Sequence, residues 1–218
     1  VMFLSLLIII VFWGAFEQAG GLMSLYTEQK TNRILSFSLP FIGNEIPAAV
    51  FQSVNAFFII VLGTSVGGFW HKWKNKGKES SSLFKMAIGV IIMAFGFFFM
   101  SKAASEVIMS GTEVAEKSAM IWLILAYLFH TIGELCASPV ALSFITKLAP
   151  IKYASFMMGS YFAATGLGNK VAGFVGGLSE NAGDFEVFTG IAVTCTIFGI
   201  LIIAILKPLK RLTHGAED

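Results

Sequence analysis

Six long apolar runs divide the chain and limit the folds that are open to it. They cover roughly residues 2–26, 48–70, 83–101, 121–145, 156–178 and 188–206. A helix needs about 20 apolar residues to cross the hydrocarbon core of a bilayer, and each run meets that requirement. None of the runs alternates strictly between polar and apolar residues, which argues against a membrane β-barrel. The sequence therefore predicts an all-α membrane protein, with one six-helix transmembrane bundle over residues 1–218.

The composition agrees with this class and excludes several others. Apolar residues make up 56% of the chain and charged residues 13%, whereas a soluble domain has about 45–50% and about 25%. This balance excludes a disordered chain, a secreted disulfide scaffold and a nucleic-acid binder with a basic face. Both cysteines, Cys136 and Cys195, fall inside apolar runs. We therefore expect no disulfide, no zinc site and no cofactor.

Basic residues gather between alternate runs and predict the orientation of the bundle. The loop after the second run, the loop after the fourth run and the tail hold ten lysines and arginines; the opposite side has four, with eight acids. Lys-rich loops remain in the cytoplasm, so this side and both ends of the chain are predicted to be cytoplasmic.

The chain starts at Val1 inside an apolar run, and we interpret it as a fragment that begins within a helix. Six helices with both ends inside are typical of the second half of a twelve-helix transporter.

Three charged residues fall inside the runs, namely Glu17, Glu134 and Lys170. A charge at the bilayer centre costs at least about 2.5–3.5 kcal/mol on insertion scales, so each needs a partner, water or a changed protonation state. For the two glutamates this cost favours a functional role. Lys170 follows Asn169, and its long stem allows its ammonium group to reach the interface, which favours a structural role.

Other polar residues repeat at helical spacing around these charges. A spacing of three or four residues places side chains on one face of a helix. Polar stripes on four helices would line a water-accessible cavity; the alternative is that they only hydrogen-bond between helices as packing, which does not explain two carboxylates. The stripes are Trp13 and Glu17; Gln52 and Asn55; His130, Glu134 and Ser138; and Tyr161, Thr165 and Asn169.

Two further patterns concern the shape and packing of the helices. Pro139 lies within the fourth run, where it removes a backbone hydrogen bond and is expected to kink the helix beside Glu134. Such a kink would be either a gating hinge or a packing adjustment. G-x-x-x-G patterns that begin at Gly63 and Gly173 are typical of closely packed membrane helices.

These residues give little support for an intramembrane enzyme. His130 and Glu134 are four residues apart and could supply two metal ligands, but no third ligand cluster accompanies them. No nucleophile stands beside a recognisable base. We therefore expect no metal site and no enzymatic activity.

Four motifs resemble the proton-dependent oligopeptide transporter (POT/PTR) family of the major facilitator superfamily. HTIGELCASPVALSFITKLAP at 130–150 is similar to the tenth-helix signature of that family, and WGAFEQAG at 13–20 to its seventh helix. IPAAVFQSVNA at 46–56 resembles the entry to the eighth helix, and MMGSYFAATGLGNKVAG at 157–173 the eleventh. The resemblance covers the whole chain as helices seven to twelve. It implies half of a twelve-helix fold in the plasma or bacterial inner membrane, a missing N-terminal six-helix half, and symport of di- and tripeptides with protons.

The same resemblance implies roles for single residues. Glu17 matches the acid of the seventh helix that is regarded as a principal protonation site, and Trp13 matches an aromatic residue that lines the cavity. Asn55 matches an amide that contacts the peptide. Glu134 matches the acid that receives the amino terminus of the peptide, and Ser138 the serine one turn later.

Some positions depart from the family pattern or have a less definite role. Tyr161 replaces a Trp, so it keeps an aromatic wall for the substrate but puts the side-chain preference in doubt. Ala56, Val50 and Ala141 replace the usual Pro, Trp and Gly. Candidates for gating or packing are Pro139, His130, Asn169 and Lys170.

Two alternative functions stay open. Relatives of this family move nitrate or other small anions, but a carboxylate at Glu134 would repel an anion unless it were protonated. The other alternative is a half-length membrane protein that senses or scaffolds by pairing with another subunit, without transport.

Overall fold

A first helical segment with an internal break and five further long helices make up the fold. The computed structural model of the chain describes residues 2–39, 43–111 and 113–211. The helical elements are α1 (Met2–Phe16), the 3-10 turn η1 (Glu17–Ala19), α2 (Leu22–Lys30), α3 (Ala48–Asn75), α4 (Ser82–Glu106), α5 (Met120–Leu148), the 3-10 turn η2 (Ile151–Tyr153), α6 (Ala154–Ala182), α7 (Asp184–Ala204) and α8 (Leu206–Arg211).

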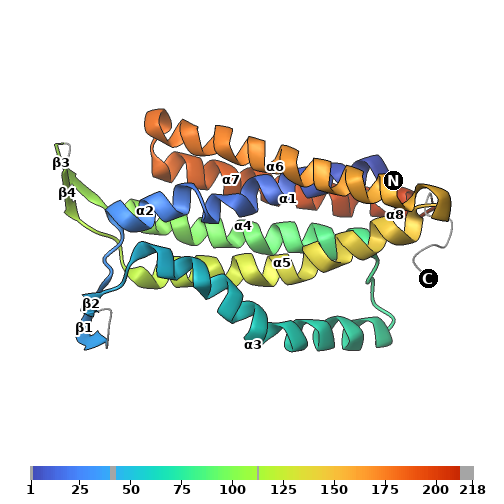
Figure 1. Cartoon of the computed structure of the whole chain (residues 1–218), viewed down its shortest axis with the longest axis horizontal. Helices are drawn as coiled ribbons and strands as arrows, with labels where there is room; N and C mark the ends of the chain where they lie inside the picture. Colours follow the sequence, from blue (N-terminus) through green and yellow to red (C-terminus); the bar gives the residue numbers. More distant parts are fainter. Residues whose placement is uncertain (1, 40–42, 112, 212–218) are drawn as a thin grey trace.

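Two short β-hairpins lie at one end of the helices (Figure 1). Strands β1 (Ile34–Leu39) and β2 (Gly43–Glu45) pair in antiparallel fashion, with Ile34 opposite Glu45. Strands β3 (Ile108–Ser110) and β4 (Glu113–Glu116) form the second hairpin, with Ser110 opposite Glu113. Strands in these connections were not expected from the sequence. The hairpins are additions to an all-α membrane fold rather than a sheet of their own.

Among the described residues, five helical segments are long and apolar enough to cross a membrane. They are Met2–Lys30, Ala48–Asn75, Ser82–Glu106, Met120–Leu148 and Asp184–Ala204. The sixth expected span, at 156–178, lies within α6, which is helical over 29 residues but is not among the five. Polar residues such as Asn169 and Lys170 lower the hydropathy of α6. Six spans therefore stay a prediction.

Helix α4 forms the centre of the packing and carries many of the fully buried side chains, among them Val90, Met93 and Phe97. It lies along both α5 and α7, while α1 lies along α6 (Figure 1). Helices α4 and α5 approach closely where glycines face each other: a Cβ atom added to Gly89 would lie 2.7 Å from the carbonyl oxygen of Gly133.

The G-x-x-x-G patterns do not make such contacts between the described residues. A Cβ atom added to any of their four glycines would meet no other atom within 4 Å. The faces of α3 and α6 that carry them do not pack on another described helix. The small-residue patterns at Gly63 and Gly173 are therefore wrong as a guide to packing within this part of the chain.

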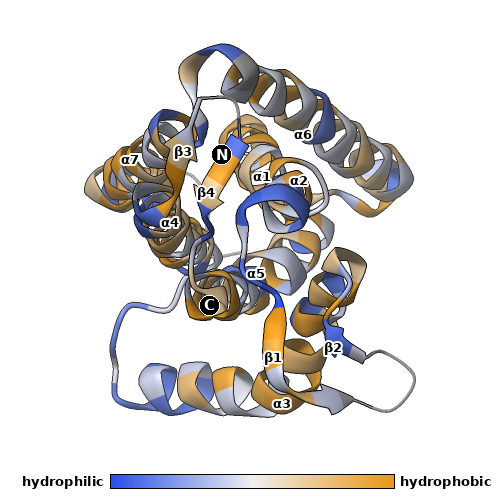
Figure 2. Cartoon of the chain, turned by 90° about the vertical axis from the view of Figure 1, so that its left-hand side faces the viewer, coloured by the Kyte–Doolittle hydropathy of each residue, from blue (hydrophilic) through white to orange (hydrophobic). Residues whose placement is uncertain are grey.

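Helix α3 lies apart from α6 and α7 at one edge of the molecule (Figure 2). Only Ala48, Phe51 and Trp70 of its residues are buried. Large apolar side chains such as Phe57 and Ile60 are exposed along it. An apolar and exposed helix needs lipid or further protein around it.

Candidate functional site

Glu17 lies at a break in the first helical segment. Helix α1 ends at Phe16, and the 3-10 turn that starts at Glu17 leads to α2. The backbone N–H groups of Gly20 and Gly21 both donate to the Glu17 carbonyl oxygen at 3.2 Å. Irregular backbone at membrane depth is tolerated where it is buried in protein or lines a cavity. The half-buried Glu17 side chain therefore stands at a point where the helix has opened.

The neighbouring Gln18 links the turn at this break to α6 by a hydrogen bond. Its side chain is buried, and its Nε2 atom donates to the carbonyl oxygen of Ala172 at 2.9 Å and to that of Gly14 at 3.3 Å. Gln18 was not among the residues predicted from the sequence. An amide next to an acid within an apolar run is the signal that would have identified it, because buried polar side chains need partners.

A hydrogen-bonded group on α3 and α5 contains the second acid. The Nδ2 atom of Asn55 donates to Glu134 Oε2 at 3.0 Å and to Thr131 Oγ1 at 3.1 Å. The Thr131 hydroxyl in turn donates to the Tyr127 carbonyl oxygen at 2.8 Å. The structure thus brings Asn55 and Glu134 together, and it adds Thr131, which the sequence analysis missed.

The two acids lie on helical segments that pack on each other. The Glu17 carboxylate lies within electrostatic range of the Glu134 carboxylate, and α1 packs on α5. Two like charges near each other repel, and the repulsion is larger in a medium of low dielectric constant than in water. A proton or a cationic ligand that neutralises one of the carboxylates therefore relieves this repulsion.

Trp13 and Ser138 border a small void of about 10 Å³ between α1, α4 and α5. The Trp13 ring makes edge contacts with Phe12 and Phe16 at 5.7 and 5.4 Å between ring centroids. On its other side α6 comes close, since a Cβ atom added to Gly168 would lie 2.8 Å from the Trp13 Cβ atom. Trp13 is thus held between α5 and α6, one turn before Glu17.

The remaining candidates are not joined to this group by any hydrogen bond between described residues. Tyr161 is buried within the hydrophobic core, and its ring contacts Phe162. Asn169 and Lys170 are exposed on α6. Pro139 is also exposed, and α5 continues through it as one helix.

His130 packs into the core, although the helical spacing predicted a face shared with Glu134. Its ring is fully buried, 4.5 Å from the ring of Phe97 and 6.5 Å from that of Phe16. Neither ring nitrogen has a hydrogen-bond partner among the described residues. Gly96 makes room for the ring, because a Cβ atom there would overlap with it.

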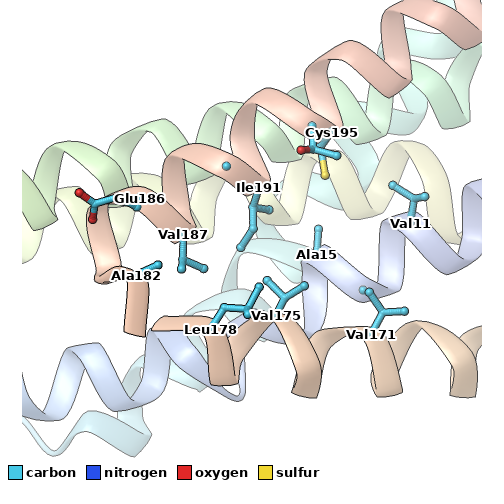
Figure 3. A pocket seen from close by; sticks show the side chains of 13 residues that line it. Val11, Ala15, Val171, Val175, Leu178, Ala182, Glu186, Val187, Ile191 and Cys195 are labelled. Atoms are coloured by element: carbon cyan, nitrogen blue, oxygen red, sulfur yellow. The ribbon is translucent and has the colours of Figure 1, made fainter. Parts of the chain in front are cut away.

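A separate apolar pocket of about 470 Å³ lies between α1, α6 and α7 (Figure 3). Val11, Val175 and Ile191 line its length, and Glu186 stands at one end. None of the candidate residues lines it. Apart from Glu186 and Thr194 its walls are largely apolar, whereas the group around Glu134 and Asn55 offers several hydrogen-bonding side chains.

Comparison with known proteins identifies the family. The profile of the POT family matches residues 1–190. The chain belongs to the POT family. Together with the apolar helices, membership identifies it as an integral, multi-pass membrane protein.

Relatives of known description agree with this membership. The chain is 34% identical, over its whole length, to the peptide transporter YePEPT of Yersinia enterocolitica, of which the match covers 41%. It is 27% identical to a di-/tripeptide transporter of Lactococcus lactis, with 93% of this chain and 39% of that protein covered. The chain therefore spans about two fifths of the length of these relatives. A crystal structure of the peptide transporter POT in complex with sulfate is similar with a TM-score of 0.80 and 26% identity, over 97% of this chain and 40% of that one.

Proposed function

We propose that this POT-family chain is the C-terminal half, helices seven to twelve, of a symporter that moves di- and tripeptides together with protons by alternating access. The observation that carries the proposal is the hydrogen-bonded pair of Asn55 and Glu134 with the Glu17 carboxylate in electrostatic range. The printed descriptions of the Yersinia and Lactococcus relatives support peptides as the substrate class. A six-helix N-terminal half completes the transporter.

Glu134 and Asn55 bind the amino terminus of the peptide in this proposal. A carboxylate and an ammonium group form a charge-assisted hydrogen bond, which is about twice as strong as a neutral one. The Nδ2 atom of Asn55 is engaged with Glu134 and Thr131, so its Oδ1 atom is the acceptor that can take a further N–H of the ammonium group. Trp13 and Ser138 form walls for the rest of the substrate, and the buried Tyr161 ring would have to turn out of the core to join them.

Glu17 carries the transported proton. With the cavity open to the outside, Glu17 takes a proton, and the repulsion between the two acids falls. The neutral side chain also releases a cationic partner in the N-terminal half, so that the two halves close around the peptide. When the cavity opens to the cytoplasm, Glu17 loses its proton and the peptide leaves. The membrane potential contributes about 2.3 kcal/mol per charge for each 100 mV.

The break at Glu17 suits this role. A side chain on an irregular turn has fewer neighbours from its own helix than one within a regular helix, so water reaches it more easily. Gln18 holds the turn against α6 by its hydrogen bond to Ala172. The proton site is therefore accessible to water, while the hydrogen bond of Gln18 keeps the turn in a fixed position.

Uptake of labelled dialanine into liposomes that contain the full-length transporter tests the proposal. We expect accumulation only with an inward proton gradient, and we expect Glu17→Gln to abolish uphill uptake while peptide exchange partly survives. Glu28→Gln is the matched control, because Glu28 is exposed on α2, eleven residues after Glu17. Concentrative uptake by Glu17→Gln at the wild-type level would refute the role of this residue.

The same assay separates the alternatives. Uptake of nitrate in place of dialanine would identify an anion transporter of the same fold. If a folded protein takes up neither, the chain functions as a sensor or scaffold without transport, and the proposal is wrong.

A further inference from the structure

A second apolar groove opens between α3, α4 and α5 at the Lys-rich end of the bundle. Helix α3 diverges from the other two helices towards this end (Figure 1), and the groove has a volume of about 440 Å³. It lies outside the site of Glu17 and Glu134. Its walls include Val66, Trp70, Phe84, Ile88, Ile132 and Cys136.

The groove continues into a cationic mouth. A second cavity of about 420 Å³ shares Val66 and Trp70 with the groove, and His71, Lys74 and Lys85 contribute to its wall. One continuous surface thus leads from an apolar channel between membrane helices to lysine side chains at the helix ends. The pocket between α1, α6 and α7 differs, because Glu186 stands at its end.

Positive charge dominates around this mouth. Lys72, Lys74, Lys76 and Lys78 take part in none of the ion pairs formed within the described ranges. Glu79 is the acid of the segment 71–85, and it already accepts from Lys210 at 2.8 Å. A negatively charged ligand would therefore meet Lys74 and its neighbours, which form no ion pair with an acid of the described residues.

Two tryptophans of the groove lie beside lysine side chains at this end of the bundle. The Lys78 ammonium nitrogen lies 4.2 Å from the centre of the Trp73 ring, and the Lys85 nitrogen lies 5.5 Å from that of Trp70. Trp side chains prefer the level of the lipid headgroups. The Trp73 Nε1 atom also donates to the Glu79 carbonyl oxygen at 2.8 Å, which holds the connection after α3 close to the groove.

We propose that this groove binds one molecule of an anionic phospholipid of the phosphatidylglycerol type. An acyl chain occupies the channel between α3 and α5, and the phosphate lies between Lys74 and Lys78. Basic pockets between membrane helices recognise anionic headgroups because their lysines neutralise the phosphate near the membrane surface. A zwitterionic lipid would fill the channel equally well but would leave the excess positive charge at the mouth.

Native mass spectrometry of the full-length protein in detergent, with added phosphatidylglycerol or phosphatidylcholine, tests this proposal. We expect phosphatidylglycerol to form the more abundant one-lipid complex. The double variant Lys74→Gln/Lys78→Gln should lose at least about fivefold in apparent affinity for phosphatidylglycerol. Lys147→Gln/Lys152→Gln is the matched control: it removes two exposed lysines from the same end of the bundle, away from the groove. We expect it to bind as the wild type does.

A second variant tests the channel without changing any charge. Val66→Trp places a large ring where the groove and the mouth meet, and it should weaken phosphatidylglycerol binding while the thermal unfolding temperature stays close to the wild-type value. Equal losses in both lysine double variants would indicate diffuse attraction and overturn the proposal. Equal binding of both lipids, competition by inorganic phosphate alone, or unchanged binding by Val66→Trp would also overturn it. Dimers that replace the lipid complex would make the groove an interface between copies.

Discussion

The hydrogen bonds of single side chains decide how the site is ordered. Asn55 has two N–H bonds to offer through Nδ2, and Glu134 and Thr131 accept one each. An amide on a helix that is otherwise exposed is held in one orientation only while both acceptors are present. Thr131 is therefore a positioning residue, which acts on the substrate through Asn55.

Removal of the Thr131 hydroxyl should weaken substrate binding. Thr131→Val keeps the shape of the side chain but removes the acceptor, and a hydrogen bond of this kind contributes about 1 kcal/mol. We expect the KM for dialanine to rise about fivefold, with little change in kcat. Thr146→Val is the control, because the Thr146 hydroxyl bonds only to the backbone of its own helix. An equal rise in both variants would show that Asn55 does not depend on Thr131.

The sequence could indicate the acids of the site but not their whole surroundings. Glu17 and Glu134 are charged residues within apolar runs, and the free-energy cost of placing a charge in a bilayer is enough to single them out. Gln18 and Thr131 are ordinary polar residues in such runs, and their importance lies in contacts with α6 and α3. Helical spacing also placed His130 beside Glu134, whereas its ring enters the gap left by Gly96. Spacing predicts a face of a helix, not the direction of a side chain within it.

At the scale of helices, the approach of α4 to α5 is the tightest contact near the site. A Cβ atom added to Gly133 would lie 2.6 Å from the Gly89 carbonyl oxygen and 3.0 Å from the Met93 Cβ atom. These contacts involve a backbone oxygen and a Cβ atom, so a change of side-chain rotamer cannot relieve the overlap. Gly133 also directly precedes Glu134, which couples this packing to the site.

Gly133→Ala should therefore separate α4 from α5 and destabilise the bundle. Overpacking of this kind costs about 1–3 kcal/mol, so we expect a lower thermal unfolding temperature in detergent and a lower affinity for dialanine. Gly67→Ala serves as the control, because a Cβ atom there meets no other atom of the described chain. A smaller loss for Gly133→Ala than for Gly67→Ala would contradict the packing described for α4 and α5. The sequence could not have ranked these glycines, since the G-x-x-x-G patterns contain Gly67 and not Gly133.

The connection between α3 and α4 is tied to α8 by a pair of charges. Burial alone would raise the pKa of Glu79, but hydrogen bonds from Lys210 and from the Ser81 backbone outweigh it and lower the pKa from 4.5 to about 2. A carboxyl whose pKa is lower in the folded state stabilises that state above its ordinary pKa and loses the effect as the pH falls. The contribution of Glu79 should therefore be constant from neutral pH to about 5 and should decline between 4.5 and 2.

Unfolding temperatures measured across this pH range check the pair. The difference between the wild type and Glu79→Gln should stay level at the upper pH values and shrink below 4.5. Glu113→Gln is the control, because Glu113 is exposed on β4 and belongs to none of the ion pairs between described residues. A difference that already changes between pH 7 and 5 would mean that Glu79 titrates near its ordinary pKa.

At the scale of the whole molecule, charge distinguishes the two ends of the bundle. Three of the four ion pairs between described residues lie at the end with the hairpins, and one lies at the Lys-rich end. The pairs are Lys30–Asp184, Arg33–Glu45 and Lys102–Glu106 at the first end, and Lys210–Glu79 at the second. Cations at the hairpin end are thus largely neutralised by acids, whereas the Lys-rich end keeps its excess of positive charge.

The long apolar runs predicted the overall fold better than they predicted its local features. Apolar runs of about 20 residues are typical of membrane-spanning helices. The all-α membrane fold was therefore predictable from the sequence, and it is confirmed. The hairpins could not, because strands of three to six residues in a connection leave no such pattern. The break at Glu17 was not predicted either, because the run at 2–26 is long and apolar on both sides of the segment 17–21.

The charge distribution predicts which end faces the cytoplasm. Because loops rich in lysine are retained on the cytoplasmic side, the connection after α3 should lie inside and the β3–β4 hairpin outside. Single cysteines at Ser110→Cys and Asn75→Cys report on these two ends. The native Cys136 and Cys195 are buried, and their replacement by alanine removes any background. A membrane-impermeant maleimide should label Ser110→Cys in intact cells and Asn75→Cys only after permeabilisation. The reverse pattern would place the Lys-rich mouth of the α3–α5 groove outside, and Glu17 would then release its proton in the wrong direction for uptake.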